Sequence, residues 1–217
     1  MRNWNQLFRG LLLALSLSPL ACGAQATANY TEGKEFKKVR EAVAPADLKR
    51  VTVEEFFWYG CPHCFHFDPT IEAWKSKKPA DVDFSRVPAT LGRPDGELHQ
   101  KAFYIAESLN VSDKIHKPLF VAIHEKHQPT NTLEQVRALF EREAGVKPAD
   151  FDRATSSFVV DSRARRAQQL AISYGITSVP LVIVGGKYVT SATMAGTPEK
   201  AMQVVNFLVE KVKKERK

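Results

Sequence analysis

Residues 51–67 read VTVEEFFWYGCPHCFHF, a strand pattern that runs directly into the start of a helix. Val51 to Tyr59 is rich in valine and aromatic residues, which is typical of a buried central strand. From His63 to about Lys78, large apolar residues recur at the spacing of one helical face. The pair Cys61 and Cys64 is therefore expected where a strand ends and a helix begins.

Outward from this stretch, the chain predicts a mixed α/β fold that a purely helical segment interrupts. Val82 to Val87 reads as a second strand, and residues 92–163 show no further strand pattern. Helices are expected there at 97–109, at 113–126 and from Thr132, where TLEQ forms a capping box.

The pattern of strands then resumes. A helix through Arg166 to Tyr174 leads back to two short strands, 181–184 and 187–190, which flank Gly185-Gly186, a hairpin signal. Thr197 and Pro198 are typical of the cap and first position of a last helix.

The first 26 residues read as an export signal. Arg2 and Arg9 precede an apolar run, and AQA at 24–26 resembles a cleavage site, so export is expected. The run is shorter than the roughly 20 apolar residues that span a bilayer. Lipid attachment at Cys22 is an alternative, which the residues before it fit poorly.

Composition limits the remaining function classes. Removal of the leader leaves Cys61 and Cys64 as the only cysteines, so a framework of structural disulfides is excluded. The formal charge of +7 includes Arg2 and Arg9, so the chain without its leader carries +5. Its basic residues are dispersed among acids, which argues against a nucleic-acid partner.

The cysteine pair at a helix start has a specific chemical use. Unpaired backbone N–H groups and the positive end of the helix dipole favour a thiolate at Cys61. We therefore expect Cys61 to be the reactive sulfur and Cys64 to be the shielded, resolving partner. His63 lies between the two cysteines, where an imidazole adds to the stabilisation of the thiolate.

Three other uses of this pair fit less well. A structural zinc site needs about four ligands, and no second cysteine pair completes one. A haem attachment site needs histidine directly after the second cysteine, where Phe65 stands. An inert disulfide across so short a loop adds little stability. No cofactor is expected.

The segment EFFWYGCPHC, residues 55–64, resembles the active-site signature of DsbA-type periplasmic oxidases, and SVP at 178–180 resembles their cis-proline loop. The likeness extends over nearly the whole chain after the leader. It implies a thioredoxin fold with an inserted all-helical subdomain: a thioredoxin-like domain from 27–91 and 164–217, and an insertion over 92–163.

The resemblance also implies roles for single residues. Cys61 would be the nucleophile, Cys64 the resolving thiol, and His63 the residue that stabilises the thiolate. Pro180 would lie against the disulfide, and the backbone of Val179 would pair with an extended substrate segment.

Glu55 is a candidate buried carboxylate, because it interrupts a largely apolar strand. A buried acid has a raised pKa and could transfer protons during thiol exchange. In the resembled family a lysine accompanies this acid, whereas Arg86 takes that place here. An arginine does not give up its proton, which puts proton sharing by the pair in doubt.

These observations predict a monomeric dithiol oxidase that donates its Cys61–Cys64 disulfide to unfolded exported proteins with free cysteines. The resemblance implies a DsbB-like, quinone-linked membrane partner that reoxidises it. The alternatives are a disulfide isomerase or reductase on the same fold, a peptide-binding holdase without redox chemistry, and a metal carrier that uses Cys61, Cys64 and His63.

Overall fold

A five-stranded sheet with the order β1-β5-β4-β2-β3 forms the centre of the molecule. The computed structural model describes residues 29–216, so the predicted leader and Cys22 lie outside the described residues. The strands are β1 (Lys37–Lys38), β2 (Val51–Phe57), β3 (Val82–Pro88), β4 (Leu181–Val184) and β5 (Tyr188–Thr190).

Strand β2 lies inside the sheet, parallel to β3 and antiparallel to β4. Its valines and phenylalanines are buried, as expected for a strand covered on both faces. It ends at Phe57, two residues before the predicted end. In the parallel register Glu55 lies directly opposite Arg86, and this pairing positions the chemistry described below.

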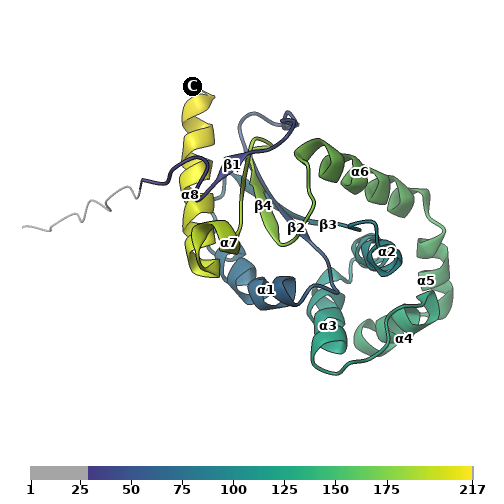
Figure 1. Cartoon of the computed structure of the whole chain (residues 1–217). Helices are drawn as coiled ribbons and strands as arrows, with labels where there is room; N and C mark the ends of the chain where they lie inside the picture. The colour runs from purple at the N-terminus through teal and green to yellow at the C-terminus, as the bar shows by residue number, and fades with distance from the viewer. Residues whose placement is uncertain (1–28, 217) are drawn as a thin grey trace, which may run out of the picture.

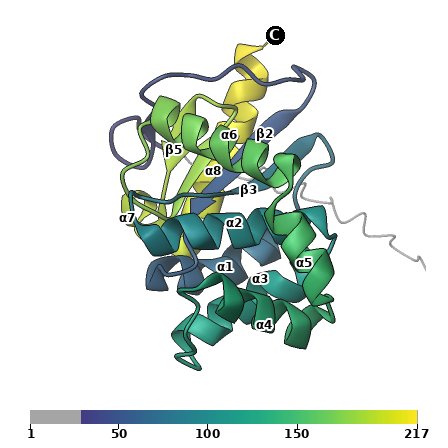
Figure 2. The same ribbon diagram turned by 90° about the vertical axis from the view of Figure 1, so that its right-hand side faces the viewer.

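Helices cover both faces of the sheet (Figures 1 and 2). α1 and α8 pack against one face, and α2 and α6 cover the other, while α3, α4 and α5 extend beyond the sheet. The helices are α1 (Pro62–Lys75), α2 (Pro94–Ser108), α3 (Ser112–His124), α4 (Leu133–Ala144), α5 (Pro148–Thr155), α6 (Phe158–Tyr174), α7 (Ala192–Ala195) and α8 (Pro198–Glu215).

The sheet and its helices have the thioredoxin arrangement, with added helices between β3 and β4, which confirms the expected fold class. The expected division between residues 163 and 164 falls inside α6, which is one continuous helix. The sequence did not predict β1, α5 or α7. All three are short, so local pattern carries little signal for them.

Two hydrophobic clusters hold these layers together. Val51, Val53 and the apolar faces of α1 and α8 form one cluster. Phe56 and Phe57 join the other, which continues into the added helices. The helical segment therefore shares a core with the sheet and is not tethered to it by loops alone.

Local signals in the sequence confirm several boundaries. The Thr132 hydroxyl accepts from the Gln135 backbone, and the Gln135 side chain accepts from the Thr132 backbone, which completes the predicted capping box. Gly185 and Gly186 have φ of 61° and 65°, the left-handed values of a tight hairpin turn. Within residues 29–216, no helix is long and apolar enough to cross a membrane.

Candidate redox site

Cys61 lies at the N-cap of α1, as the sequence predicted. A turn after β2 brings it there, and its backbone N–H donates to Trp58 O at 3.0 Å. Its Sγ accepts from the backbone N–H of Cys64 at 3.4 Å. A sulfur in this position faces the free amides of the first helical turn, which favour negative charge.

The pKa values of the two thiols are shifted in opposite directions. The hydrogen bond from the Cys64 thiol, helped by the backbone amides of Cys64 and His63 and the charge of His63, lowers the pKa of Cys61 to about 6, although burial opposes this. Burial and the same hydrogen bond raise the pKa of Cys64. Cys61 is 8% exposed and Cys64 is fully buried, so only Cys61 offers an accessible sulfur.

The loop before β4 lies against the cysteines. Cys61 Sγ is 3.7 Å from the carbonyl oxygen of Val179, and the peptide bond between Val179 and Pro180 is cis. The structure thus brings together Cys61, Cys64, Val179 and Pro180, which are 115 or more residues apart across the two segments. His63 is exposed beside them.

Glu55 lies buried on β2, with 2% of its surface exposed. Removal from water raises its pKa to about 7, although the charge of Arg86 opposes this. The negative charge of Glu55 in turn contributes to the raised pKa of Cys64. The predicted buried carboxylate is therefore present, and it interacts electrostatically with the buried thiol.

Arg86 binds three carboxylates at once, with its side chain 8% exposed. Nε donates to Glu55 at 2.9 Å, and the two terminal nitrogens donate to Asp68 and Glu72 at 2.7 Å each. A planar guanidinium can satisfy several acceptors in this way, whereas a lysine ammonium acts as a point charge. We refer to Glu55, Asp68, Glu72 and Arg86 as the carboxylate cluster.

His116 of α3 links this cluster to the segment before Cys61. Its Nε2 is 3.0 Å from Asp68 Oδ1, and its Nδ1 is 2.9 Å from the Tyr59 hydroxyl. A neutral ring with its proton on Nε2 donates to Asp68 and accepts from Tyr59, which satisfies all three groups. Burial is the largest effect on the pKa of His116 and lowers it, which favours this neutral form.

A second histidine of α3 holds the site from the other side. His124 Nε2 is 2.7 Å from the backbone carbonyl oxygen of Tyr59. Its ring stacks on Phe65, the residue after Cys64, with centroids 5.1 Å apart. The added helices therefore contact the chain on both sides of the cysteine motif.

Sequence reasoning did not identify Asp68, Glu72, His116 or His124 as part of the site. One signal was available, because Cys64, Asp68 and Glu72 recur every four residues and so share one face of α1. No local signal points to the two histidines, which come from a helix some 50 residues further along the chain.

A groove of about 930 Å³ begins at Val179 and Pro180 and extends towards β1. Its lining combines apolar side chains from the loop and from β4 and β5 with basic ones. The basic members are Lys37, Lys38, Arg40, His63 and His66, and we call this surface the cationic groove.

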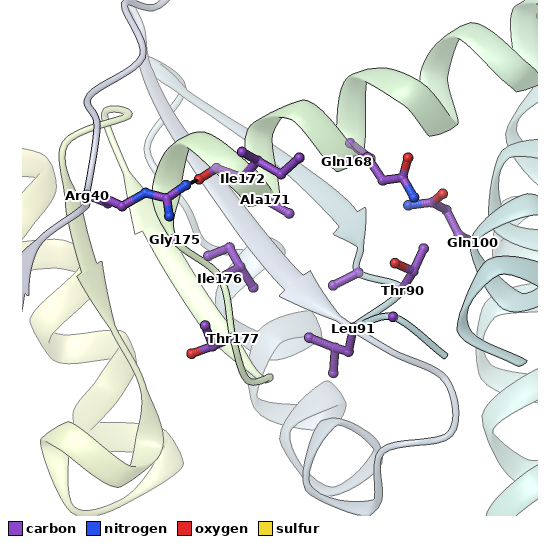
Figure 3. Close-up of a pocket in the computed structure, with 13 residues that line it drawn as sticks. Arg40, Thr90, Leu91, Gln100, Gln168, Ala171, Ile172, Gly175, Ile176 and Thr177 are labelled. Carbon is purple, nitrogen blue, oxygen red and sulfur yellow. Dashed lines mark hydrogen bonds between the residues drawn. The ribbon is translucent and has the colours of Figure 1, made fainter. Parts of the chain in front are cut away.

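A second pocket, of about 670 Å³, adjoins this groove at the segment Gly175–Thr177 (Figure 3). That segment lines both cavities. Arg40 also borders both, and its guanidinium donates to the carbonyl oxygen of Ile172 near the end of α6. The bond fixes the position of Arg40 beside the groove.

Comparison with known proteins gives a consistent result. Residues 52–203 match the family model described as a DSBA-like thioredoxin domain. The thiol:disulfide interchange protein DsbA of Pseudomonas aeruginosa is 36% identical over 207 residues, which cover 95% of this chain and 96% of that protein.

Solved structures agree with this match. The crystal structure of Pseudomonas aeruginosa DsbA is similar with a TM-score of 0.80, over 86% of this chain and 96% of that one. A Proteus mirabilis DsbA, solved with a non-covalently bound peptide, is 27% identical with a TM-score of 0.74, over 84% of this chain and 99% of that one.

Proposed function

Because the chain belongs to the DsbA-like thioredoxin family, we propose that it oxidises the thiols of other proteins with a disulfide formed between Cys61 and Cys64. It is a thiol:disulfide oxidoreductase, as its relatives are. The observation that carries the assignment to these two residues is the lowered pKa of Cys61 beside the raised pKa of Cys64. A thiol with a pKa of about 6 leaves readily from a disulfide, which favours donation of the bond.

The proposed reaction transfers two electrons from substrate to enzyme. A substrate thiolate attacks Cys61 Sγ, the bond between Cys61 and Cys64 breaks, and its electron pair leaves on Cys64, which takes up a proton. A second substrate thiolate attacks the substrate sulfur of the mixed disulfide and displaces Cys61 as a thiolate. The substrate leaves oxidised and the enzyme leaves reduced, with no cofactor.

Glu55 is the proposed partner for the proton of Cys64. A buried thiol with a raised pKa needs a base before it can attack, and a carboxylate with a pKa of about 7 can act as one near neutrality. Arg86 keeps its own proton, so its role is to hold the carboxylate in place and to balance its charge.

Val179 and Pro180 are the proposed substrate contacts, because both line the cationic groove and the carbonyl oxygen of Val179 is 3.7 Å from Cys61 Sγ. His63 is the proposed residue that stabilises the thiolate, and its charge acts on Cys61 in that direction. An extended peptide could pair with the backbone of Val179. The bound peptide of the Proteus mirabilis DsbA supports peptides as the substrate class.

We further infer that the protein acts in the periplasm, as a monomer, on unfolded exported proteins with free cysteines. The leader-like sequence of residues 1–26 supports export, with lipid attachment at Cys22 as the weaker alternative. A DsbB-like, quinone-linked membrane protein is the proposed reoxidant. A nucleic-acid partner is not part of this proposal.

Alkylation of the reduced protein tests the roles of the two cysteines. We expect iodoacetamide to modify Cys61 with a midpoint near pH 6 and to leave Cys64 unmodified until the protein unfolds. In Cys64→Ala the midpoint should rise, because the hydrogen bond from that thiol is the largest cause of the acidity of Cys61. Mass spectrometry of the labelled peptides measures both sites. Equal labelling, or an onset near about 8.5, would contradict the assignment.

The role of Glu55 is tested in the resolving step alone. A mixed disulfide of Cys61 with a small thiol releases that thiol when Cys64 attacks, and we expect Glu55→Gln to slow the release by at least about tenfold at pH 7. The pH profile should also lose its dependence on a group with a pKa of about 7.

Glu54→Gln is the matched control for this experiment. Glu54 neighbours Glu55 on β2, but it faces the opposite side of the strand and accepts from the Tyr174 hydroxyl at 2.9 Å. If both variants slow the release to the same extent, the effect is structural and Glu55 is not the base.

A further inference from the structure

The cationic groove carries a charge pattern that the thiol chemistry does not require. Lys37 and Lys38 are exposed on the edge strand β1, Arg40 follows them, and His63 and His66 are exposed on α1. Among the side chains of residues 29–216 that line the groove, none is an aspartate or glutamate. Lys37, Lys38 and Arg40 therefore make the field positive in the part of the groove that they line.

The nearby acids leave most of this charge uncompensated. Glu32 lies 3.8 Å from Lys38, and both side chains are largely exposed, so the pair is weak. Lys37 has no ion-pair partner within residues 29–216. The guanidinium of Arg40 donates to a backbone carbonyl, which fixes its position without neutralising its charge.

The apolar part of the lining limits what can bind there. The groove that the basic residues of β1 line also has apolar members, which are Ile176, Val179, Leu181, Val189 and Met194. A small inorganic anion would leave this surface in water, whereas a peptide segment covers it and brings charge with it. Val179 lines the groove and its carbonyl oxygen is 3.7 Å from Cys61 Sγ, so an occupant that passes Val179 comes close to the reacting sulfur.

We propose that the cationic groove selects reduced polypeptide segments that carry an acidic residue beside an apolar one, close to the cysteine that attacks Cys61. This specificity rests on the proposed function. The acidic side chain faces Arg40 and one of the two lysines of β1, whose side chains alternate in direction, while the apolar neighbour covers the apolar part of the lining. An exposed ion pair changes a rate by roughly 1.4- to 5-fold, so an acid that contacts two of these cations should react up to about 30-fold faster at low salt.

The test compares peptides that differ in one charge. Each has a single cysteine, an apolar residue and either Asp, Asn or Lys two positions away, and rapid quenching measures the formation of the mixed disulfide with the oxidised protein. Because a nearby charge alters the peptide thiol itself, each rate is divided by that for an uncharged small disulfide. We expect the peptide with Asp to react fastest and the peptide with Lys to react slowest. The difference between their rates should shrink in about 1 M salt, where the Debye length is about 3 Å.

Two charge variants locate the effect. Lys37→Glu/Lys38→Glu should reverse the order of the rates. Lys37→Gln/Lys38→Gln, a milder change that is less apt to alter the fold, should reduce the differences between the rates. The control Lys147→Glu/Lys214→Glu makes the same change in net charge at two exposed positions outside the groove and away from the carboxylate cluster. It should keep the order seen for the unmodified protein.

The outcomes separate this inference from the function on which it rests. If the peptides react equally, or if the control variant Lys147→Glu/Lys214→Glu changes the order of the rates as much as the β1 variant does, the groove does not select acidic segments. The same conclusion follows if the β1 variants bind anionic lipid vesicles less tightly in a sedimentation assay but keep the peptide rates of the unmodified protein. Oxidation of dithiothreitol, which is uncharged, at a normal rate would then leave the proposed function intact, whereas its loss in the unmodified protein would overturn that function.

Discussion

Replacement of Arg86 with leucine is expected to lower the free energy of unfolding by about 3–5 kcal/mol at neutral pH. The substitution leaves Glu55 and Asp68 buried without their cation, and a buried charge without a partner is strongly destabilising. Urea unfolding at pH 7 measures the loss. The stability of Arg86→Lys should lie between those of the unmodified protein and of Arg86→Leu, because one ammonium cannot replace the three-way contact of the guanidinium.

The loss should depend on pH in a defined direction. Without Arg86 the pKa of Glu55 rises further, so its carboxyl is more easily protonated in the folded than in the unfolded protein. In the unmodified protein the pKa of Glu55 is already about 7, so the part of the loss that is due to Glu55 is constant below that pH and grows as the pH rises from about 7 towards the higher pKa of the variant. Arg137→Leu is the control, since Arg137 binds Glu141 and Asp152 at the surface and should cost no more than about 1 kcal/mol. Equal losses in the two variants would show that the carboxylate cluster does not stabilise the fold.

The second large effect concerns the relative stability of the reduced and oxidised protein. Folding lowers the pKa of Cys61 from an unfolded value of about 8.5 to about 6. A depressed folded pKa stabilises the reduced protein fully above the unfolded value, and this stabilisation disappears as the pH falls through the folded one. Between pH 5 and pH 8 the reduced form should therefore gain about 2.5 kcal/mol relative to the oxidised form, which has no thiolate.

This gain is large enough to change which form is more stable. Closing a four-residue loop with a disulfide contributes about 2 kcal/mol in the loop-entropy treatment, independent of pH. We expect the oxidised form to unfold at higher urea at pH 5 and the reduced form to be at least as stable at pH 8. Groups that titrate equally in both forms cancel in the difference. His63→Ser should reduce the change with pH, and a difference that stays constant from pH 5 to pH 8 would rule out a stabilised thiolate.

The sequence predicted the elements whose pattern is local. The strand and helix on either side of Cys61, the capping box at Thr132 and the turn at Gly185-Gly186 each depend on residues within one or two turns of chain. β1 could not be found in this way. Two lysines have no strand pattern, and they form a strand only because β5 lies beside them.

The residues of the site can be divided in the same way, into those with a local sequence signal and those without one. Cys61 and Cys64 follow from spacing, and the burial of Glu55 follows from its place in an apolar strand. The contact of Asp68 with His116 joins residues 48 apart on different helices, and it depends on how the added helices pack against the sheet. A single sequence holds no periodic signal for such a contact, because it arises from tertiary packing alone.

The direct pairing of Glu55 with Arg86 in the parallel register also bears on how the strands find their alignment during folding. If β3 slipped by one residue along β2, Ser85 or Val87 would stand opposite Glu55, and Arg86 would turn to the other face of the sheet. The carboxylate would then be buried without a cation, at a cost of several kcal/mol. We therefore expect the misaligned sheet to be disfavoured by electrostatics as well as by packing. The ion pair that lies near the buried thiol would then also favour the native register of β2 and β3 during folding.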